Sequence, residues 1–390
     1  MNNHHENKIP ILSFYSGGGF MDMGFEKAGF EIVWTNEIDE VFVKLHEAGI
    51  TSWRKARGNG IKAEIFNKKS ITDVNANTII NEAFPEGKPK DFGIIGGPPC
   101  QDFTINGNLE GFEGKRGMLT IVFFDRILEL KPTFFVMENV TGLTRSNSTK
   151  KHMQELVRRL EKEYYVDHKT INALDFGVPQ FRERVFFIGI LKDKLNQEIV
   201  NNSLGEWFTF PMNSKFYGAA NKYKWPTAVR FGKKLKKPKD LPLELCVESC
   251  LVSSREMKNI PNSKEYFKLY AEEKELQKID EGETNRPSFK RLHRFKYSPT
   301  ACYGNNEVHL HPYKNRRLSV RETLRIQGVE DSYVLPPELP LNKKFKMIGN
   351  GVPVPLAEAV ANALKDFIRM NNVIEITNQW TYGLNENEAK

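Results

Sequence analysis

The chain has 390 residues, 39% of them hydrophobic, and a formal net charge of +8. Its length allows two domains with a sizeable core, and it has no apolar run of membrane-spanning length, which favours a soluble protein. The amino terminus, residues 1–6, lacks the basic-then-apolar pattern of a secretion signal, so we expect a cytoplasmic protein.

The cysteines, at positions 100, 246, 250 and 302, are too few and too scattered for a disulfide framework. Cys246 and Cys250 are four residues apart and would fit half of a metal site. No second Cys/His pair at finger spacing accompanies them, although histidines follow at positions 293, 309 and 311. We therefore expect no metal.

Over the first 192 residues, apolar segments that predict strands alternate with helical patterns. The predicted strands cover residues 9–15, 31–37, 91–97, 133–139, 165–172 and 184–191. Apolar residues recur at helical spacing from Leu119 to Leu130, as expected of a helix packed on a sheet. Strand, helix and strand in series predict an α/β fold with a mainly parallel, doubly wound sheet.

A glycine-rich loop, YSGGG at residues 15–19, follows the first predicted strand and precedes a helical pattern. Such a loop lets the backbone approach a nucleotide closely, and Glu37, about 20 residues on, is placed to take ribose hydroxyls. The spacing is not Gly-x-Gly-x-x-Gly, and no Lys-Ser/Thr phosphate grip follows. The loop alone leaves a dinucleotide as a competing ligand.

One cysteine ends a predicted strand in the run GGPPCQDFT, residues 96–104. Two glycines and two prolines stop the strand, so Cys100 stands where open α/β sheets bind ligands. The next predicted strand delivers Glu138 in the same way, and a nucleophile and a carboxyl group on two strand ends suit covalent catalysis. Composition alone favours a buried structural cysteine, and the surrounding motifs reverse that interpretation.

Arg182 and Arg184 lie in the run QFRER, residues 180–184, at the start of the last predicted strand. Their i, i+2 spacing places both on one face, which by itself fits an exposed strand edge. Pro179 and Gln180, which precede the two arginines, and the apolar residues 185–187, which follow them, favour a functional site.

From about residue 195 the alternation of strands and helices ends, and lysine clusters and turns follow. Residues 196–315 hold 21 Lys and Arg against 14 Asp and Glu, so seven of the eight excess positive charges lie there. This suits a polyanion such as nucleic acid, and a solvated lysine-rich surface is the alternative. Residues 272–283 form an acidic, helical-looking patch, and helical periodicity returns over residues 356–368. The polar tail after about residue 372 is expected to fray.

In chain order, these segments resemble the DNA (cytosine-5)-methyltransferase family of bacterial restriction–modification systems. PPCQ (98–101) is similar to the nucleophile motif, ENV (138–140) to the carboxylate motif and QFRER to the Gln-x-Arg-x-Arg motif. FYSGGG (14–19) is similar to the cofactor loop and IGNGVP (348–353) to the last motif. The resemblance runs from about residue 9 to 364. Phe20 departs from it, because many members carry a further glycine there.

The resemblance implies a Rossmann-like S-adenosylmethionine-dependent methyltransferase sheet with a smaller inserted target-recognition domain. The catalytic and cofactor-binding domain would comprise residues 1–192 and 343–375, with the late helix packed back onto the sheet. Residues 193–342 would form the target-recognition domain and a framework segment, and residues 376–390 a polar tail.

The implied cofactor is S-adenosylmethionine. Tyr15 matches the aromatic residue that stacks on adenine, Glu37 matches the ribose acid, and Asp73 with Val74 matches the pair that reads the adenine edge. A turn cap is the alternative for Asp73. The matched set is Tyr15, Gly17, Gly19, Glu37, Ile38, Asp73, Val74, Asn350 and Val352.

The implied reaction is methylation of C5 in a cytosine flipped out of duplex DNA. The thiolate of Cys100 would add to C6, and Glu138, with a raised pKa, would supply a proton or hydrogen bond at N3. Arg184 matches the contact to O2, and Arg182 matches its neighbour that orders the thiol. Residues 101–118 predict a mobile loop closing over DNA. The predicted DNA contacts are Gln101, Thr104, Asn106, Arg116 and Thr300.

Two other functions stay open at this point. A tRNA cytosine-5 methyltransferase of the same fold shares the Phe-Thr that follows Gln101-Asp102, but it carries a Cys-Phe-Thr signature that the long insert here lacks. A non-catalytic DNA-binding regulator would need a broken site. We expect double-stranded DNA as the partner of a cytoplasmic monomer acting on nucleoid DNA, together with a cognate restriction endonuclease for the same site. The amino-acid sequence does not indicate which DNA sequence is the target.

Overall fold

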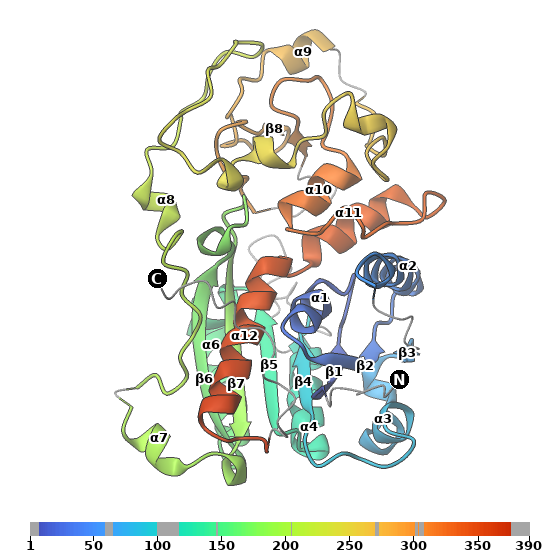
Figure 1. The fold of residues 1–390 in the computed structure, drawn as a ribbon, viewed down its shortest axis with the longest axis vertical. Helices are drawn as coiled ribbons and strands as arrows, with labels where there is room; N and C mark the ends of the chain where they lie inside the picture. Colours follow the sequence, from blue (N-terminus) through green and yellow to red (C-terminus); the bar gives the residue numbers. More distant parts are fainter. Residues whose placement is uncertain are drawn as a thin grey trace.

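The computed structural model describes residues 8–58, 65–99, 117–145, 147–203, 205–269, 273–300, 303 and 308–375. Figure 1 shows a lower part, in which helices pack on one sheet, and an upper part of loops and short helices. The polar tail and nearly all of the predicted mobile loop fall outside these ranges. So do the predicted site residues Cys100, Gln101, Thr104, Asn106 and Arg116.

The lower part is built on a seven-stranded sheet in the order β3-β2-β1-β4-β5-β7-β6. Its strands are β1 (Pro10–Phe14), β2 (Glu31–Asn36), β3 (Ile65–Asn67), β4 (Gly93–Gly96), β5 (Phe134–Asn139), β6 (Tyr164–Asn172) and β7 (Glu183–Leu191). Neighbours from β3 to β5 pair in parallel, whereas β7 is antiparallel to both β5 and β6. The six predicted strands and the mainly parallel sheet are confirmed. β3 was not predicted, because three residues are too few to show a strand period.

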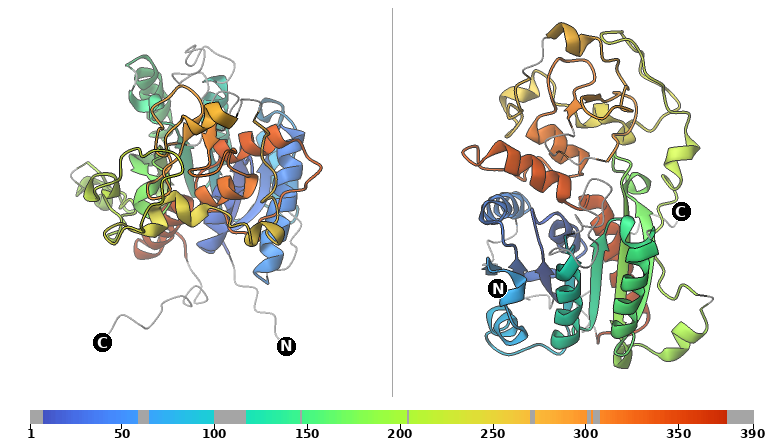
Figure 2. Two further views of the ribbon diagram at one scale, coloured as in Figure 1. Left: turned by 90° about the horizontal axis from the view of Figure 1, so that it is seen from above. Right: turned by 180° about the vertical axis from the view of Figure 1, so that it is seen from behind.

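Helices cover both faces of the sheet, which confirms the doubly wound arrangement. On the face turned to the viewer in Figure 1, α1 (Phe20–Lys27) and α12 (Val354–Met370) lie together. The other face, seen in the right-hand view of Figure 2, carries α4 (Gly117–Leu130) and α6 (Asn147–Leu160). The helical periods read at residues 119–130 and 356–368 are therefore confirmed.

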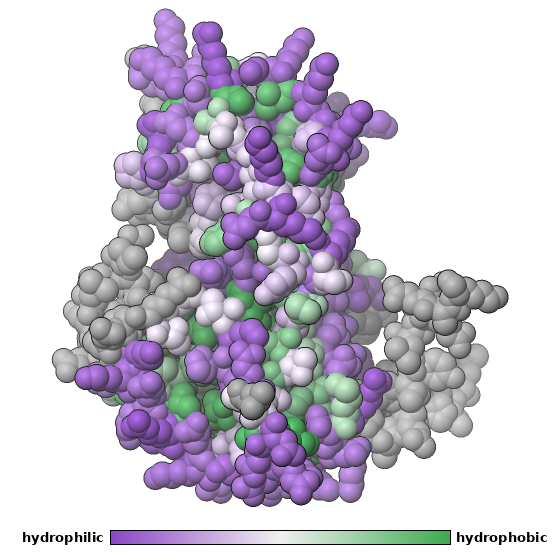
Figure 3. All heavy atoms as spheres, turned by 90° about the vertical axis from the view of Figure 1, so that its left-hand side faces the viewer, coloured by the Kyte–Doolittle hydropathy of each residue, from purple (hydrophilic) through white to green (hydrophobic). Residues whose placement is uncertain are grey.

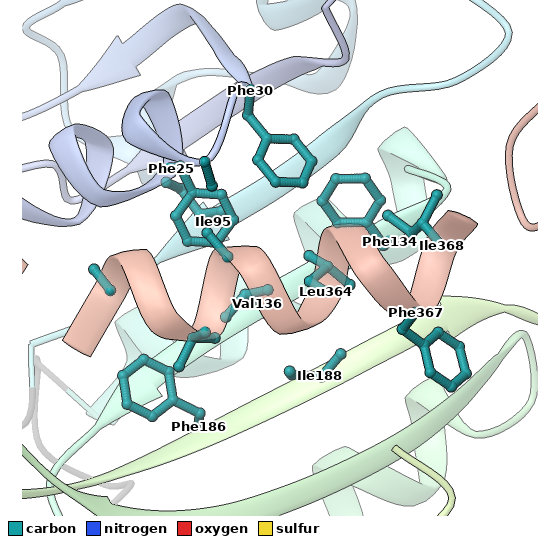
Figure 4. Close-up of a cluster of buried hydrophobic side chains, with 14 of the residues drawn as sticks. Phe25, Phe30, Ile95, Phe134, Val136, Phe186, Ile188, Leu364, Phe367 and Ile368 are labelled. Carbon is teal, nitrogen blue, oxygen red and sulfur yellow. The ribbon is translucent and has the colours of Figure 1, made fainter. Parts of the chain in front are cut away.

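Two apolar clusters join these helices to the sheet. In the first, Leu364 and Phe367 of α12 pack over Val136 and Ile188, as Figure 4 shows. This contact explains how the late helix returns to the amino-terminal strands. The second cluster, on the opposite face, is centred on Phe123 and other apolar residues of α4. Among the helices of the described ranges, none is long and apolar enough to cross a membrane.

The upper part joins the lower one through a third apolar cluster. There Leu324, Tyr333 and Phe345 pack with Phe20 and Trp53, which come from the helices that follow β1 and β2. The other helices and strands are α2 (Glu40–Ala56), α3 (Ala76–Ala83), α5 (Gly142–Arg145), α7 (Gln197–Asn201), α8 (Ala219–Lys222), α9 (Glu273–Gln277), β8 (Lys290–Arg291), β9 (His309–Leu310), α10 (Val320–Ile326) and α11 (Leu341–Asn350). The 3-10 turns are η1 (Ile71–Asp73), η4 (Ala173–Phe176), η5 (Lys192–Lys194), η6 (Leu243–Leu245), η7 (Val247–Cys250) and η8 (Glu256–Lys258). The domain boundaries drawn from the sequence stay predictions.

The acidic patch at residues 272–283 is helical only in α9. Arg291 ends the helical pattern, because its guanidinium donates to the carbonyl oxygens of Leu276 and Ile279 over 2.7 and 2.8 Å. Gly282 follows at a left-handed φ of 95°. Arg291 itself is fully buried and lies over the ring of Phe231. This arginine of the basic and aromatic stretch 286–295 therefore stabilises the fold and is not available to nucleic acid.

Candidate active site

The carboxyl ends of β4 and β5 bring the predicted carboxylate beside the turn that precedes the predicted nucleophile. A Cβ added to Gly97 would lie 3.1 Å from Oε2 of Glu138, so a larger residue in the turn would displace the carboxylate slightly. The Asn139 side chain donates to the carbonyl oxygen of Pro98 over 3.3 Å. Gly97-Pro98-Pro99 is thereby fastened to the end of β5. Cys100, the next residue in the chain, lies outside the described residues.

Glu138 forms an ion pair with Arg184, whose Nε lies 2.8 Å from Oε1 of the carboxylate. The strand register explains the pair, because Phe186 lies opposite Glu138 and Arg184, two residues earlier, shares its face. The side chain of Arg184 is only 12% exposed and that of Glu138 only 10%. Burial raises the pKa of Glu138, and the charges of Arg184 and Arg182 oppose this rise. The site thus holds a carboxyl group whose pKa lies above its usual range although two arginines face it.

Arg182 is 1% exposed, so the exposed strand edge considered for it is wrong. Its Nη2 donates to the carbonyl oxygen of Gly349 over 2.9 Å, and its backbone N–H donates to the side chain of Asn172. Arg182 therefore joins the start of β7 to α11, one residue before the predicted cofactor contact Asn350. This placement fits an arginine that holds neighbouring segments of the site together.

Gln180 and Gln327 make a second connection that sequence reasoning did not assign. Gln180 is fully buried and donates to the side chain of Gln327, which in turn donates to the carbonyl oxygen of Ile348 over 2.6 Å. Beside them, the hydroxyl of Thr300 donates to the carbonyl oxygen of Phe181 over 2.8 Å. The predicted recognition residue Thr300 thus binds directly to the QFRER run, and its contact with DNA stays a prediction.

The glycine-rich loop, residues 15–19 (hereafter the cofactor loop), lies at the carboxyl ends of β1 and β2. Gly17 N–H donates to Oε2 of Glu37 over 3.1 Å, and Asp39 N–H donates to Oε1 over 2.8 Å. Burial raises the pKa of Glu37, and these two backbone hydrogen bonds oppose the rise. A Cβ on Gly17 would meet only the Tyr15 carbonyl oxygen, at 4.0 Å, so space lies open beside the carboxylate. An oriented carboxylate facing open backbone fits the ribose of a nucleoside cofactor.

The other predicted cofactor residues surround this loop. Tyr15 has a left-handed φ of 55°, and its hydroxyl donates to the carbonyl oxygen of Leu119 over 2.9 Å. Ile38 is 63% exposed, as suits a side chain that would cover a ligand. Asp73 is exposed in η1, whereas Val74 beside it is buried. Asn350 is exposed at the end of α11, and Val352 is buried. Gly19 completes the loop at a φ of 72°.

A buried polar cluster under the cofactor loop was missed at the level of sequence. The hydroxyl of Ser13 donates to Oδ1 of Asp22 over 2.6 Å, and Nε2 of His46 lies 3.6 Å from Oδ2. Gly19 passes directly over His46, because an added Cβ would lie 2.5 Å from Nε2. Burial lowers the pKa of His46 to about 3, so the imidazole is neutral. The one available signal was an aspartate among the apolar residues of α1.

Asp22→Asn is expected to increase stability at alkaline pH. Burial raises the pKa of Asp22 from 3.8 to about 7. The folded protein therefore keeps a proton that the unfolded chain loses above about pH 4, and stability declines as the pH rises towards 7. The variant lacks this penalty, so its free energy of unfolding at pH 8 should exceed that of wild type by roughly 2–4 kcal/mol.

Thermal unfolding followed by circular dichroism between pH 5 and 9 measures this difference. Asp366→Asn, at an exposed position of α12, serves as the control, and its stability should follow that of wild type across this pH range. A gain for Asp22→Asn that is equally large at pH 5 and pH 9 would contradict the assignment.

Comparison with known proteins agrees with this geometry. Residues 9–366 match the family model for C-5 cytosine-specific DNA methylase. The type II methyltransferase M.NmeDI of Neisseria meningitidis serogroup C is 37% identical over 368 residues, which cover 93% of this chain and 84% of that protein. M.NgoPII of Neisseria gonorrhoeae is 34% identical, with 92% and 96% covered.

Solved structures show the same fold. A putative DNA modification methyltransferase encoded within an E. coli prophage aligns with a TM-score of 0.59 at 23% identity, covering 93% of this chain and 100% of that one. A mutant of DNMT2 from Spodoptera frugiperda aligns with a TM-score of 0.57 at 17% identity, covering 92% and 100%.

The chain belongs to the C-5 cytosine-specific DNA methylase family, and it is a DNA (cytosine-5)-methyltransferase of the restriction–modification type. This answers the two alternatives left open by the sequence. The family match and the relatives favour the DNA enzyme over a tRNA methyltransferase and over a silent regulator.

Proposed function

We propose that the protein methylates C5 of a cytosine flipped out of a short, specific duplex DNA sequence, through a covalent bond from Cys100 to C6. The observation that carries this proposal is the buried Glu138–Arg184 pair beside the Gly97-Pro98-Pro99 turn. The pair supplies an acid and a cation at the point where the chain enters Cys100. C6 of a stacked base is inaccessible, so the target base has to leave the helix.

The roles of the side chains follow from where charge develops on the ring. When the thiolate of Cys100 adds to C6, an electron pair moves toward N3 and O2, and C5 becomes nucleophilic. Glu138, whose pKa is raised by burial, donates to N3, and Arg184 stabilises the charge at O2. After methylation a base takes the C5 proton, the electron pair of that C–H bond forms the C5=C6 double bond, and the C6–S bond breaks so that Cys100 leaves as a thiolate. Arg182 keeps β7 and α11 together around these groups.

The proposed cofactor is S-adenosylmethionine, which when bound supplies an electrophilic methyl group. Glu37 supports this choice, since two backbone N–H groups fix its carboxylate and one of them belongs to Gly17, beside which a Cβ would find open space. Glu37, with Ile38 beside it, would take the ribose hydroxyls, Tyr15 would stack on adenine, and Asp73 with Val74 would contact the adenine edge. Gly17 and Gly19 would allow close approach, and Asn350 and Val352 would close the methionine end.

Bisulfite sequencing of DNA from cells that express the protein tests the proposal. Protected cytosines at one position of one short sequence are expected, and the same data identify the target. Absence of protected sites in DNA, with methylated cytosine appearing in tRNA, would contradict the proposal. Cells carrying Cys100→Ser provide the matched background.

Biologically, we propose a cytoplasmic monomer that modifies nucleoid DNA and protects it from a cognate restriction endonuclease. The type II relatives support the pairing with an endonuclease. Gln101, Thr104, Asn106, Arg116 and Thr300 are the proposed DNA contacts. Light scattering of the purified protein should give the 44.9 kDa of one chain.

The exposed lysine cluster at positions 233, 234, 236 and 237 is expected to bind phosphate. Figure 3 shows hydrophilic side chains projecting from the upper part of the molecule. Replacing these four lysines with serine should weaken DNA binding without changing the methylated site. The slope of the logarithm of the binding constant against the logarithm of the salt concentration should become shallower by up to about 4. Binding measured by fluorescence anisotropy across a salt series tests this.

A control variant removes an equal number of exposed lysines from the lower part, and it should keep the wild-type slope. Its positions are Lys44, Lys55, Lys68 and Lys90. An equal loss of DNA affinity and of salt dependence in both variants would contradict a specific role of the lysine cluster in binding phosphate.

A further inference from the structure

Tyr333 connects the segment after α10 to the cofactor loop. It is fully buried, and its hydroxyl donates to the carbonyl oxygen of Gly18 over 2.7 Å. These two residues are 315 positions apart in the chain. On the other side of Gly18, an added Cβ would lie 2.9 Å from Sδ of Met347 in α11. The middle peptide of the loop is therefore held between Tyr333 and α11.

The ring of Tyr333 occupies a space that only glycine can provide. A Cβ on Gly49 of α2 would lie 2.1 Å from Cζ of the tyrosine. The ring also meets Phe20 edge-on, with centroids 5.5 Å apart. Next to it, Val334 N–H donates to the hydroxyl of Ser52 over 2.9 Å. The fold thus fixes both the ring and the direction of its hydroxyl.

A buried polar network holds the backbone of Tyr333 in turn. Arg321, fully buried in α10, donates to the carbonyl oxygens of Tyr333, Glu330 and Pro261 over 2.7, 3.1 and 3.1 Å. Asn262 pairs with Leu335 through its side chain, accepting from the backbone N–H over 3.0 Å and donating to the carbonyl oxygen over 2.8 Å. Residues of the predicted recognition segment are therefore connected through Arg321 to the cofactor loop.

From these contacts we infer that Tyr333 is a positioning residue for the cofactor loop, which it holds through the Gly18 carbonyl oxygen so that affinity for the nucleoside cofactor depends on its hydroxyl. This inference rests on the proposed use of S-adenosylmethionine. Glycine-rich loops have wide conformational freedom, which has to be lost when a ligand binds. Glu37 anchors Gly17 from one side and Tyr333 anchors Gly18 from the other, so that much of this loss occurs before binding.

Tyr333→Phe removes only the hydroxyl and tests the inference. Its matched control is Tyr164→Phe, because Tyr164 is also fully buried and donates to a carbonyl oxygen, that of Pro132, over 3.0 Å at the opposite end of the sheet. Isothermal titration calorimetry with S-adenosylhomocysteine should show affinity weakened about two- to twelve-fold in Tyr333→Phe, the effect of one hydrogen bond, and unchanged in the control.

Steady-state assays separate positioning from general damage. The KM for S-adenosylmethionine should rise by the same factor, while kcat and the KM for DNA stay within about twofold. Wild-type affinity in Tyr333→Phe, or equal losses in the two variants, would overturn the inference. If the wild-type protein does not bind S-adenosylhomocysteine, the proposed cofactor is wrong and the inference falls with it.

Ser52→Ala gives a second, milder test if Tyr333→Phe does not fold. It removes the hydroxyl that accepts from Val334 N–H while leaving the tyrosine ring in place. A smaller loss of affinity in the same direction is expected. Unchanged affinity in this variant would also overturn the inference.

Discussion

Cys100→Ser is expected to lower the rate of methyl transfer by at least about four orders of magnitude, the scale seen when a covalent nucleophile is removed. Serine at neutral pH offers almost no alkoxide for attack at C6, and no other residue replaces the thiolate. Affinity for S-adenosylhomocysteine should be unchanged, because the loop anchors Glu37 and Tyr333 belong to other parts of the chain. Transfer of tritiated methyl groups to DNA measures the rate.

Cys246→Ser is the matched control for this variant. The thiol of Cys246 is buried, burial raises its pKa to about 12, and it donates to the carbonyl oxygen of Pro242, which a serine hydroxyl can also do. It should keep wild-type activity. DNA carrying 5-fluorocytosine should trap a covalent adduct with the wild type and not with Cys100→Ser, because fluorine at C5 prevents the final elimination. Near-normal transfer by Cys100→Ser would refute the mechanism.

Glu138→Gln is expected to reduce kcat by about 10²- to 10⁴-fold, the usual contribution of general acid catalysis. Glutamine keeps the shape of the side chain and can still donate a hydrogen bond, but its amide cannot transfer a proton to N3 and carries no charge to hold Arg184. Since burial raises the pKa of Glu138, the wild-type kcat should fall as the pH rises through that pKa and the carboxyl group loses its proton. This decline should be absent in the variant. Single-turnover rates between pH 5 and 9 test both points.

A second ion pair, at the opposite edge of the sheet, provides a control. Asp91, just before β4, pairs with Lys194 over 2.7 Å, with side chains 14% and 19% exposed. Asp91→Asn breaks an ion pair of similar burial far from the chemistry and should leave kcat within about threefold. A loss equal to that of Glu138→Gln would show that the effect reflects damage to the sheet and not proton donation.

Local patterns predicted the strands and the chemistry-bearing residues at their ends, because apolar runs stopped by glycine or proline determine both. Glu138 was predicted in this way. Its pairing with Arg184 was not, since that contact depends on β7 running antiparallel to β5, which no local pattern indicates. Arg182 looked like an exposed residue by spacing alone, whereas in the fold it is buried and its guanidinium meets the end of α11, 167 positions along the chain.

Contacts between distant segments explain the remaining failures. In the sequence, Tyr333 and Gly49 are an ordinary aromatic residue and a glycine within a helix. Only the fold, which packs the segment after α10 against α2, shows that the tyrosine ring needs a glycine at position 49. Asp22 is similar, because the largest cause of its raised pKa is burial, which depends on the packing of distant segments around it. The helical pattern at residues 272–283 correctly predicted α9, which is about one turn long. Hydrogen bonds from Arg291, outside the pattern, end the helix there.

The position of α12 in the chain has a consequence for synthesis on the ribosome. This helix covers the sheet face that includes Val136, yet its residue Leu364 is made 228 residues later. At a translation rate of about 5–20 residues per second, that face is without α12 for roughly 10–50 s. During this interval the nascent chain presents an uncovered apolar surface and depends on chaperones or on temporary contacts. Truncations that remove α12 should therefore accumulate as aggregates rather than as a smaller folded enzyme.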